Sequence, residues 1–191
     1  RSSLNSNNEA FLALARERRT EYVSNRLSSP PWRIRKLLLE YGLRARAIDD
    51  LVGVFNKGYC ATTCDQLPVG CCHILGYDLG LVPDAMLEVQ AREAAWRATS
   101  GRSWNPPGPD EVERKCRYHT DTGCVLARFK SPACIGYLCN GLVADLQGRY
   151  EAEPLQRFLD ALATFRNQDL DRRRIFEAME RVLETGHALE T

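Results

Sequence analysis

Eight cysteines are the residues of this chain whose type and spacing could do chemistry, and all eight lie between residues 60 and 139 of 191. They divide into two groups of four, which are Cys60, Cys64, Cys71 and Cys72, followed by Cys116, Cys124, Cys134 and Cys139. A chain that used cysteine only as a small apolar residue would scatter it along its length. Four thiolates are the ligand set of a tetrahedral zinc ion or of an iron–sulfur cluster. The distribution therefore predicts one or two cysteine-ligated metal centres in segment 60–139.

The spacing within the groups leaves several chemistries open. Three residues separate Cys60 from Cys64, and four separate Cys134 from Cys139, which is the range of structural zinc sites. A thiolate is also a redox-active nucleophile, so disulfides and a reactive thiol are alternatives to a metal. The disulfide alternative fits an oxidising compartment, but disulfide frameworks mostly belong to chains too short to build a core, and this chain is longer.

The adjacent pair Cys71 and Cys72 favours two centres that lie close together. Neighbouring side chains point in diverging directions, so such a pair seldom binds one small ion. One group of four per half of the segment is the simpler alternative, and the sequence leaves both open. The ligand segment spans about eighty residues and includes an alanine-rich helical pattern. This length favours a buried iron–sulfur cluster of the 4Fe-4S type over a compact zinc finger, with zinc as the alternative.

Two histidines lie close to the cysteines. His73 follows Cys72 directly, and His119 lies three residues after Cys116. Either imidazole could replace a cysteine as a ligand, although a hydrogen bond to a thiolate or a plain loop position is the more ordinary role. Tyr118 and Tyr137 are expected to pack beside the centres.

The elements that must position these cysteines are predicted to be helices. Amphipathic patterns predict helices from about 8 to 27, from Pro31 to Gly42, over 47–56 and 84–100, from Ser131-Pro132 to about Arg149, and twice more after Glu151. Gly42 is expected to end or kink its helix, and Gly58 to cap the next one directly before Cys60. Strand signals are nearly absent, so we expect an all-α fold whose helices bracket a loop-rich, cysteine-ligated metal centre.

Composition and charge disfavour several other functions. The 26 Lys and Arg residues balance 25 Asp and Glu, so no net field favours nucleic acid. No apolar run is long enough to span a membrane, and the first thirty residues lack a signal-peptide core, so we expect a cytoplasmic protein. No hydrolase triad, phosphate-binding loop or dinucleotide fingerprint is present. Residues 1–7 are expected to be disordered, and 8–191 to form a single domain.

The order of the cysteines resembles that of the YkgJ-type cysteine-cluster family, whose members are described as zinc- or iron-chelating domains. In that family a short cysteine pair and a Cys-Cys step precede a distant block of four cysteines. Here the Cys-Cys step is Cys71-Cys72, and the distant block contains Gly123-Cys124 and an aromatic residue, Tyr137, inside its last interval. The resemblance covers roughly residues 60–139 and implies metal chelation. Flagellin lysine methylases, which look like distant relatives, keep an enzymatic interpretation open.

Together these observations predict an iron–sulfur protein that transfers electrons or senses redox state, with a protein redox or interaction partner. One alternative is a structural zinc-binding interaction module. The other is an iron–sulfur enzyme in which one iron is open to substrate, because fewer than four protein ligands hold that centre.

Overall fold

A computed structural model of the chain describes residues 32–63, 84–100, 116, 118–120, 123–166 and 172–190. This part of the chain is all-α, as the sequence predicts, apart from one small hairpin. Its elements are α2 (Trp32–Thr62), α4 (Asp84–Thr99), β1 (His119–Thr120), β2 (Gly123–Cys124), α5 (Pro132–Ile135), α6 (Asn140–Arg149), α7 (Ala152–Arg166) and α8 (Arg172–Glu190). The predictions for residues 1–7 and for a helix over 8–27 fall outside the described residues.

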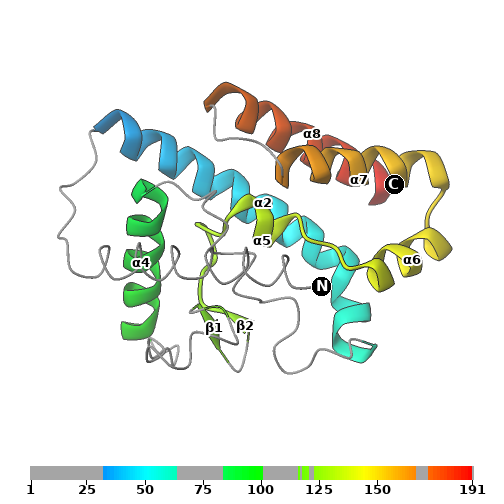
Figure 1. Cartoon of the computed structure of the whole chain (residues 1–191), viewed down its shortest axis with the longest axis horizontal. Helices are drawn as coiled ribbons and strands as arrows, with labels where there is room; N and C mark the ends of the chain where they lie inside the picture. The colour runs from blue at the N-terminus through cyan, green and yellow to red at the C-terminus, as the bar shows by residue number, and fades with distance from the viewer. Residues whose placement is uncertain are drawn as a thin grey trace, which may run out of the picture.

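Helix α2 is the long element to which most of the others attach (Figure 1). It runs without interruption for 31 residues, so the predicted break at Gly42 and the predicted cap at Gly58 are wrong. Gly42 serves a close contact instead, because a Cβ there would lie 2.7 Å from Cε1 of Phe129. At Gly58 the helix simply continues, and Thr62 Oγ1 donates a hydrogen bond to the Gly58 carbonyl at 2.8 Å. Cys60 therefore lies in the last turn of α2 rather than beyond its end.

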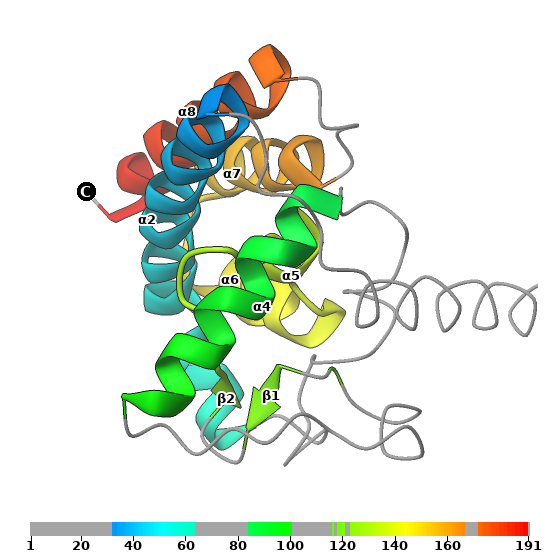
Figure 2. The ribbon, with the colours of Figure 1, turned by 90° about the vertical axis from the view of Figure 1, so that its left-hand side faces the viewer.

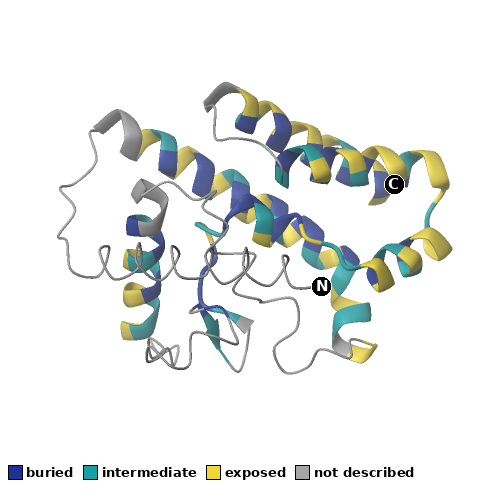
Figure 3. Ribbon diagram, viewed as in Figure 1, coloured by how far each residue is buried: buried dark blue, intermediate teal, exposed yellow. Residues whose placement is uncertain are grey.

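Helices α7 and α8 form a pair that covers one side of α2. The prediction of two helices after Glu151 is confirmed. In both helices an apolar residue recurs every three or four positions, and these residues form the buried face (Figure 3). The resulting core includes Phe55 of α2, Phe158 of α7 and Met179 of α8, all fully buried. Phe55 and Phe158 have ring centroids 5.1 Å apart. No helix among the described residues is long and apolar enough to cross a bilayer.

Helix α4 packs on the other side of α2, and the β1–β2 hairpin lies beside α4 (Figure 2). Helix α4 begins at Asp84 and ends at Thr99, as predicted. The hairpin was not predicted, because two-residue strands are too short to produce a hydrophobic alternation. A second apolar cluster joins these two elements and consists of Ala94, Cys116, Tyr118, Val125 and Leu126, with Cys124 packed against it. The two sides of α2 thus have separate apolar clusters.

The predicted helix from Ser131-Pro132 to Arg149 is divided into two. Both outer ends agree with the prediction, but α5 has only four residues and α6 starts at Asn140. Residues 136–139 are not helical. Because of this break, α5 and α6 are separate helices, and each of them packs on both α2 and α7. The break places Cys134 inside α5 and Cys139 at the N-cap of α6.

Candidate metal centre

The β1–β2 hairpin brings His119 and Cys124 face to face. These two residues are paired across the antiparallel strands. The amide of Val125 donates to the carbonyl of Tyr118 at 2.8 Å, so the adjacent pair of His119 and Cys124 is a non-hydrogen-bonded pair. Side chains of such a pair share one face, with Cβ atoms about 4.5–5.5 Å apart. An imidazole and a thiol, two groups of kinds that can bind metal ions, therefore lie side by side.

Cys116 and Cys124 share an apolar environment. Cys116 is 8% exposed within the second cluster, and Cys124 is half-buried against it. The amide of His119 donates to the carbonyl of Cys116 at 2.9 Å, and this hydrogen bond closes a turn that leads from Cys116 into the hairpin. Tyr118 is 1% exposed, which agrees with its predicted packing role. The two thiols are thus held beside one apolar cluster, which limits water access around them.

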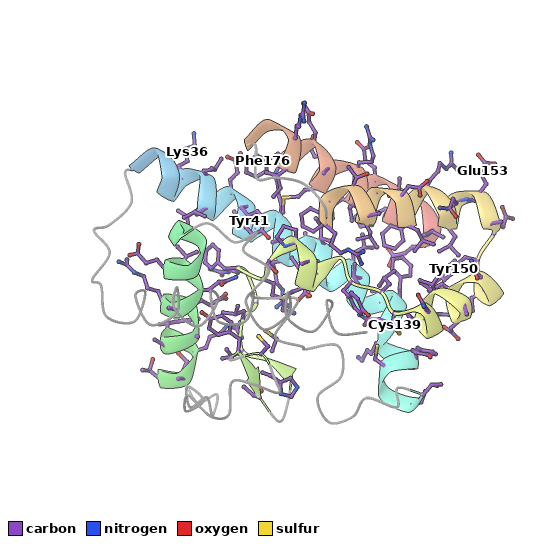
Figure 4. All side chains as sticks on the ribbon, viewed as in Figure 1. Lys36, Tyr41, Cys139, Tyr150, Glu153 and Phe176 are labelled. Carbon is purple, nitrogen blue, oxygen red and sulfur yellow. The ribbon has the colours of Figure 1, made fainter. Side chains whose placement is uncertain are left out.

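Cys60 and Cys139 lie away from the hairpin, near the junction of α2 and α6. Tyr59 precedes Cys60 in the last turns of α2, and its hydroxyl occupies the position where a Cβ of Gly141 would be. Figure 4 shows Cys139 beside the C-terminal part of α2. Both thiols are half-buried. Residues separated by about eighty positions in sequence therefore reach one helix junction.

The sulfur of Cys139 lies against the first turn of a helix. Cys139 is the N-cap of α6, and its Sγ accepts a hydrogen bond from the amide of Leu142 at 3.4 Å. Amide donors directed at sulfur are a regular feature of metal–thiolate centres.

Cys134 lies in α5 beside a polar group of residues. Ser131 Oγ donates to Cys134 Sγ at 3.1 Å, and the amide of Cys134 donates to Ser131 Oγ at 3.3 Å. Although the residue is exposed at the surface, desolvation by the surrounding protein raises the pKa of the Cys134 thiol. The Ser131 hydrogen bonds and the Lys130 ammonium lower this pKa in part, and the Asp49 carboxylate raises it. Because the Cys134 residue is exposed to solvent, water limits the net rise of its pKa.

Residues 127–130, which we call the strap, connect Cys124 to Cys134 and are clamped by α4. The Glu93 carboxylate accepts hydrogen bonds from the amides of Ala127, Arg128 and Phe129 at 3.1 to 3.2 Å. Gln90 Nε2 donates to the Phe129 carbonyl at 2.6 Å. Both α4 side chains are almost fully covered, with Gln90 at 0% and the Glu93 side chain at 7% exposure.

Helix α2 clamps the strap from the other direction. Tyr41 donates its hydroxyl hydrogen to the Lys130 carbonyl at 2.6 Å. Lys130 Nζ donates to both carboxylate oxygens of Asp49, at 2.6 and 2.8 Å. Burial raises the pKa of Tyr41 well above its ordinary value, and the nearby Cys134 adds to the rise. The strap is therefore held by hydrogen bonds from two helices at once.

None of these clamping residues follows from the sequence. Asp49, Gln90 and Glu93 lie on helices among many charged and polar residues, where such side chains ordinarily face solvent. Their partners are between 34 and 81 residues away. No local signal could have found them, because the contacts depend on how α2 and α4 cross the strap.

The predicted ligands divide into those that the structure describes and those that it does not. Cys60, Cys116, Cys124, Cys134 and Cys139 are thiols, so the disulfide alternative gains no support from them. Cys64, Cys71, Cys72 and His73 lie outside the described residues. Within the described ranges, no three His, Cys, Asp or Glu side chains come close enough together to hold one metal ion. Hydrogen-bond donors are directed at two of the described sulfur atoms, the Ser131 hydroxyl at Cys134 Sγ and the Leu142 amide at Cys139 Sγ.

Comparison of the chain with models of protein families, with curated proteins and with solved structures finds no match.

Proposed function

We propose that this chain is a metal-binding protein whose eight cysteines ligate one or two iron–sulfur clusters, and that it transfers electrons or senses redox state. The observation that supports this most directly is the pair of hydrogen bonds from the Leu142 amide to Cys139 Sγ and from the Ser131 hydroxyl to Cys134 Sγ. Metal-bound thiolates carry negative charge and are regularly stabilised by such donors.

The apolar environment of the hairpin cysteines favours a cluster over a single ion. Iron–sulfur clusters are sensitive to solvent exposure, and burial is one of the properties that set their potential. Cys116 belongs to the second apolar cluster, and Cys124 packs against it. This apolar cluster also contains the buried side chains of Val125 and Leu126. The undescribed Cys64, Cys71 and Cys72 would complete the ligand set.

Anaerobic reconstitution of the full chain with ferrous iron and sulfide tests this proposal. We expect a brown protein with iron and acid-labile sulfide in equal amounts, and visible absorption that dithionite bleaches. A colourless protein that binds stoichiometric zinc and rejects iron and sulfide would refute the cluster.

Serine substitution of each cysteine in turn tests the ligand set. We expect cluster loss when a ligand is replaced, and the matched control Ala133→Ser, next to Cys134 in α5, should keep its cluster. A single dispensable cysteine with the cluster retained would instead favour the enzyme with an open iron site.

Zinc is the second candidate, and one observation favours it. The imidazole of His119 lies opposite Cys124 in the hairpin, and zinc binds mixed cysteine and histidine ligands. A structural zinc module would lose its fold when the metal is removed, because the binding free energy contributes to folding. Chelation followed by circular dichroism checks this, and a retained helical spectrum and melting temperature would exclude a structural zinc site. The variant His119→Gln should then weaken zinc binding more than the exposed control His187→Gln.

A further inference from the structure

One face of helix α2 carries large apolar side chains that the fold leaves uncovered. Leu39, Leu43 and Val54 are 61%, 65% and 59% exposed, although other faces of the same helix supply buried residues to the core. The described part of the chain exposes five large hydrophobic side chains, and these are three of them. Single exposed apolar residues are ordinary, but a group on one face is typical of a surface that binds another protein.

The uncovered face has the spacing of a coiled-coil seam, and we call it the stripe. Its six positions follow one another at alternating intervals of three and four residues, and all of them are exposed: Glu40, Leu43, Ala47, Asp50, Val54 and Lys57. This alternation keeps side chains on one line that a second helix can cover. From Glu40 to Lys57 the stripe is about 25 Å long. Its shape and length therefore fit a helix as the occupant.

The stripe is complementary to itself when two copies run in opposite directions. In an antiparallel pair of α2 helices, Glu40 of one copy would face Lys57 of the other copy, and Leu43 would face Val54. Twofold symmetry makes each of these contacts occur twice. A parallel pair would place Glu40 beside Glu40 and Lys57 beside Lys57, where like charges repel. The sequence of the stripe thus favours the antiparallel pair.

The middle and the ends of the stripe have room for the second helix. At the middle Ala47 would face Asp50, whose carboxylate is paired with Arg46 of its own helix at 2.7 Å. The small side chain of Ala47 leaves space for that ion pair, so the interface buries no unpaired charge there. At the ends Leu39 would lie over Gly58, where an added Cβ would meet nothing within 4 Å.

We propose that this protein forms a twofold symmetric dimer in which the α2 helices of two copies pack antiparallel through the stripe. The occupant of the uncovered face is thus a second copy of the chain. A single helix pair of this length buries less than the roughly 800 Å² per partner of a standard interface, so we expect a dissociation constant in the micromolar range. The inference does not rest on the proposed metal centre, because no residue of the stripe is a predicted ligand.

Sedimentation velocity of the full chain, run in reductant so that no intermolecular disulfide forms, tests the dimer. The mass should rise from the monomer value of 21.6 kDa toward twice that value across a micromolar concentration series. Leu43→Glu should weaken self-association at least about tenfold, because symmetry places the new carboxylate in the apolar contact twice. Val54→Glu should act in the same way. The matched control Trp96→Glu changes a side chain on α4 that is also 65% exposed, and it should leave self-association unchanged.

Charge reversal tests the antiparallel register. Glu40→Lys and Lys57→Glu each place like charges opposite one another and should weaken the dimer about fivefold. The double variant restores opposite charges in exchanged places, so it should associate within about twofold of the wild type. All the substituted side chains are exposed, so the helical circular dichroism of every variant should match that of the wild type.

Three results would overturn the inference. A wild type that stays a monomer across the series would exclude the dimer, and the uncovered face would then belong to another segment of this chain or to a different protein. A dimer that Leu43→Glu and Val54→Glu leave intact, or that Trp96→Glu weakens as much, would place the contact elsewhere on the molecule. A double charge variant as weak as the single ones would refute the antiparallel register.

Discussion

Glu93 should contribute more to stability than any ordinary helix carboxylate, because it binds backbone rather than solvent. In the variant Glu93→Ala the amides of Ala127, Arg128 and Phe129 lose their acceptor. A hydrogen bond to a charged group contributes about 1.5–3 kcal/mol net. Arg128 is exposed, so water can replace its bond, while Ala127 is buried and Phe129 is half-buried. Two bonds at the lower limit of that range predict a loss of about 3 kcal/mol.

Urea unfolding followed by circular dichroism measures this loss as a lower midpoint at an unchanged slope. Glu93→Gln keeps one acceptor oxygen but not the charge, so its loss should be about half as large. The matched control is Glu153→Ala on α7, whose side chain is 85% exposed and pairs with the exposed Arg157. That control should change the unfolding free energy by less than about 0.5 kcal/mol.

The strap also joins two of the predicted ligands, so the same variant tests its role in the proposed metal centre. Loosening residues 127–130 should let Cys124 and Cys134 move relative to each other, and cluster retention should fall together with stability. The assignment of Glu93 as the clamp would be refuted if Glu93→Ala unfolded within about 0.5 kcal/mol of the wild type, the spread of neutral surface substitutions.

Two further predictions concern the core and alkaline pH. Gly186→Ala should cost about 1–3 kcal/mol, because its Cβ would overlap the side chain of Leu51. Gly148→Ala, with nothing within 4 Å, should instead stabilise by about 0.5–1 kcal/mol in the same urea assay, and equal effects of the two would contradict the packing. The raised pKa of Tyr41 stabilises the fold fully below the unfolded value of about 10, and this contribution is lost as pH rises above it. Above about pH 10 the unfolding free energy should therefore fall more steeply with pH in the wild type than in Tyr41→Phe, by up to about 1.4 kcal/mol per pH unit. Parallel curves for the two proteins would contradict burial of the Tyr41 hydroxyl.

The sequence alone predicted the elements whose signals are local. Helices α4, α7 and α8 follow from a repeat of apolar residues that needs no partner to be recognised. Ser131-Pro132 correctly indicated the start of α5, since a hydroxyl N-cap and a proline in the first turn act within one turn of helix. The clustering of the cysteines also predicts a metal-binding segment, and this stays a prediction.

Glycine signals failed where packing was stronger than propensity. Gly42 lowers helix propensity by only about 1 kcal/mol, and α2 continues through it because the helix packs against α8 on one side and Phe129 on the other. The break between α5 and α6 was missed for the converse reason. Residues 136–139 leave the helix so that two short helices can each pack on α2 and α7, which no local pattern records.

The sequence by itself therefore determines the available chemistry, because it places all the thiols in one segment and predicts helices before and after that segment. Tertiary structure decided the surroundings of the thiols, since Cys116 and Cys124 belong to or pack against one apolar cluster, while Cys60 and Cys139 lie on α2 and at the N-cap of α6, two helices that pack on each other. It also decided that Glu93 and Asp49 hold the strap. The physical reason is that these contacts join residues far apart in sequence, and their formation depends on how whole helices cross, which is determined by burial of apolar surface over many residues.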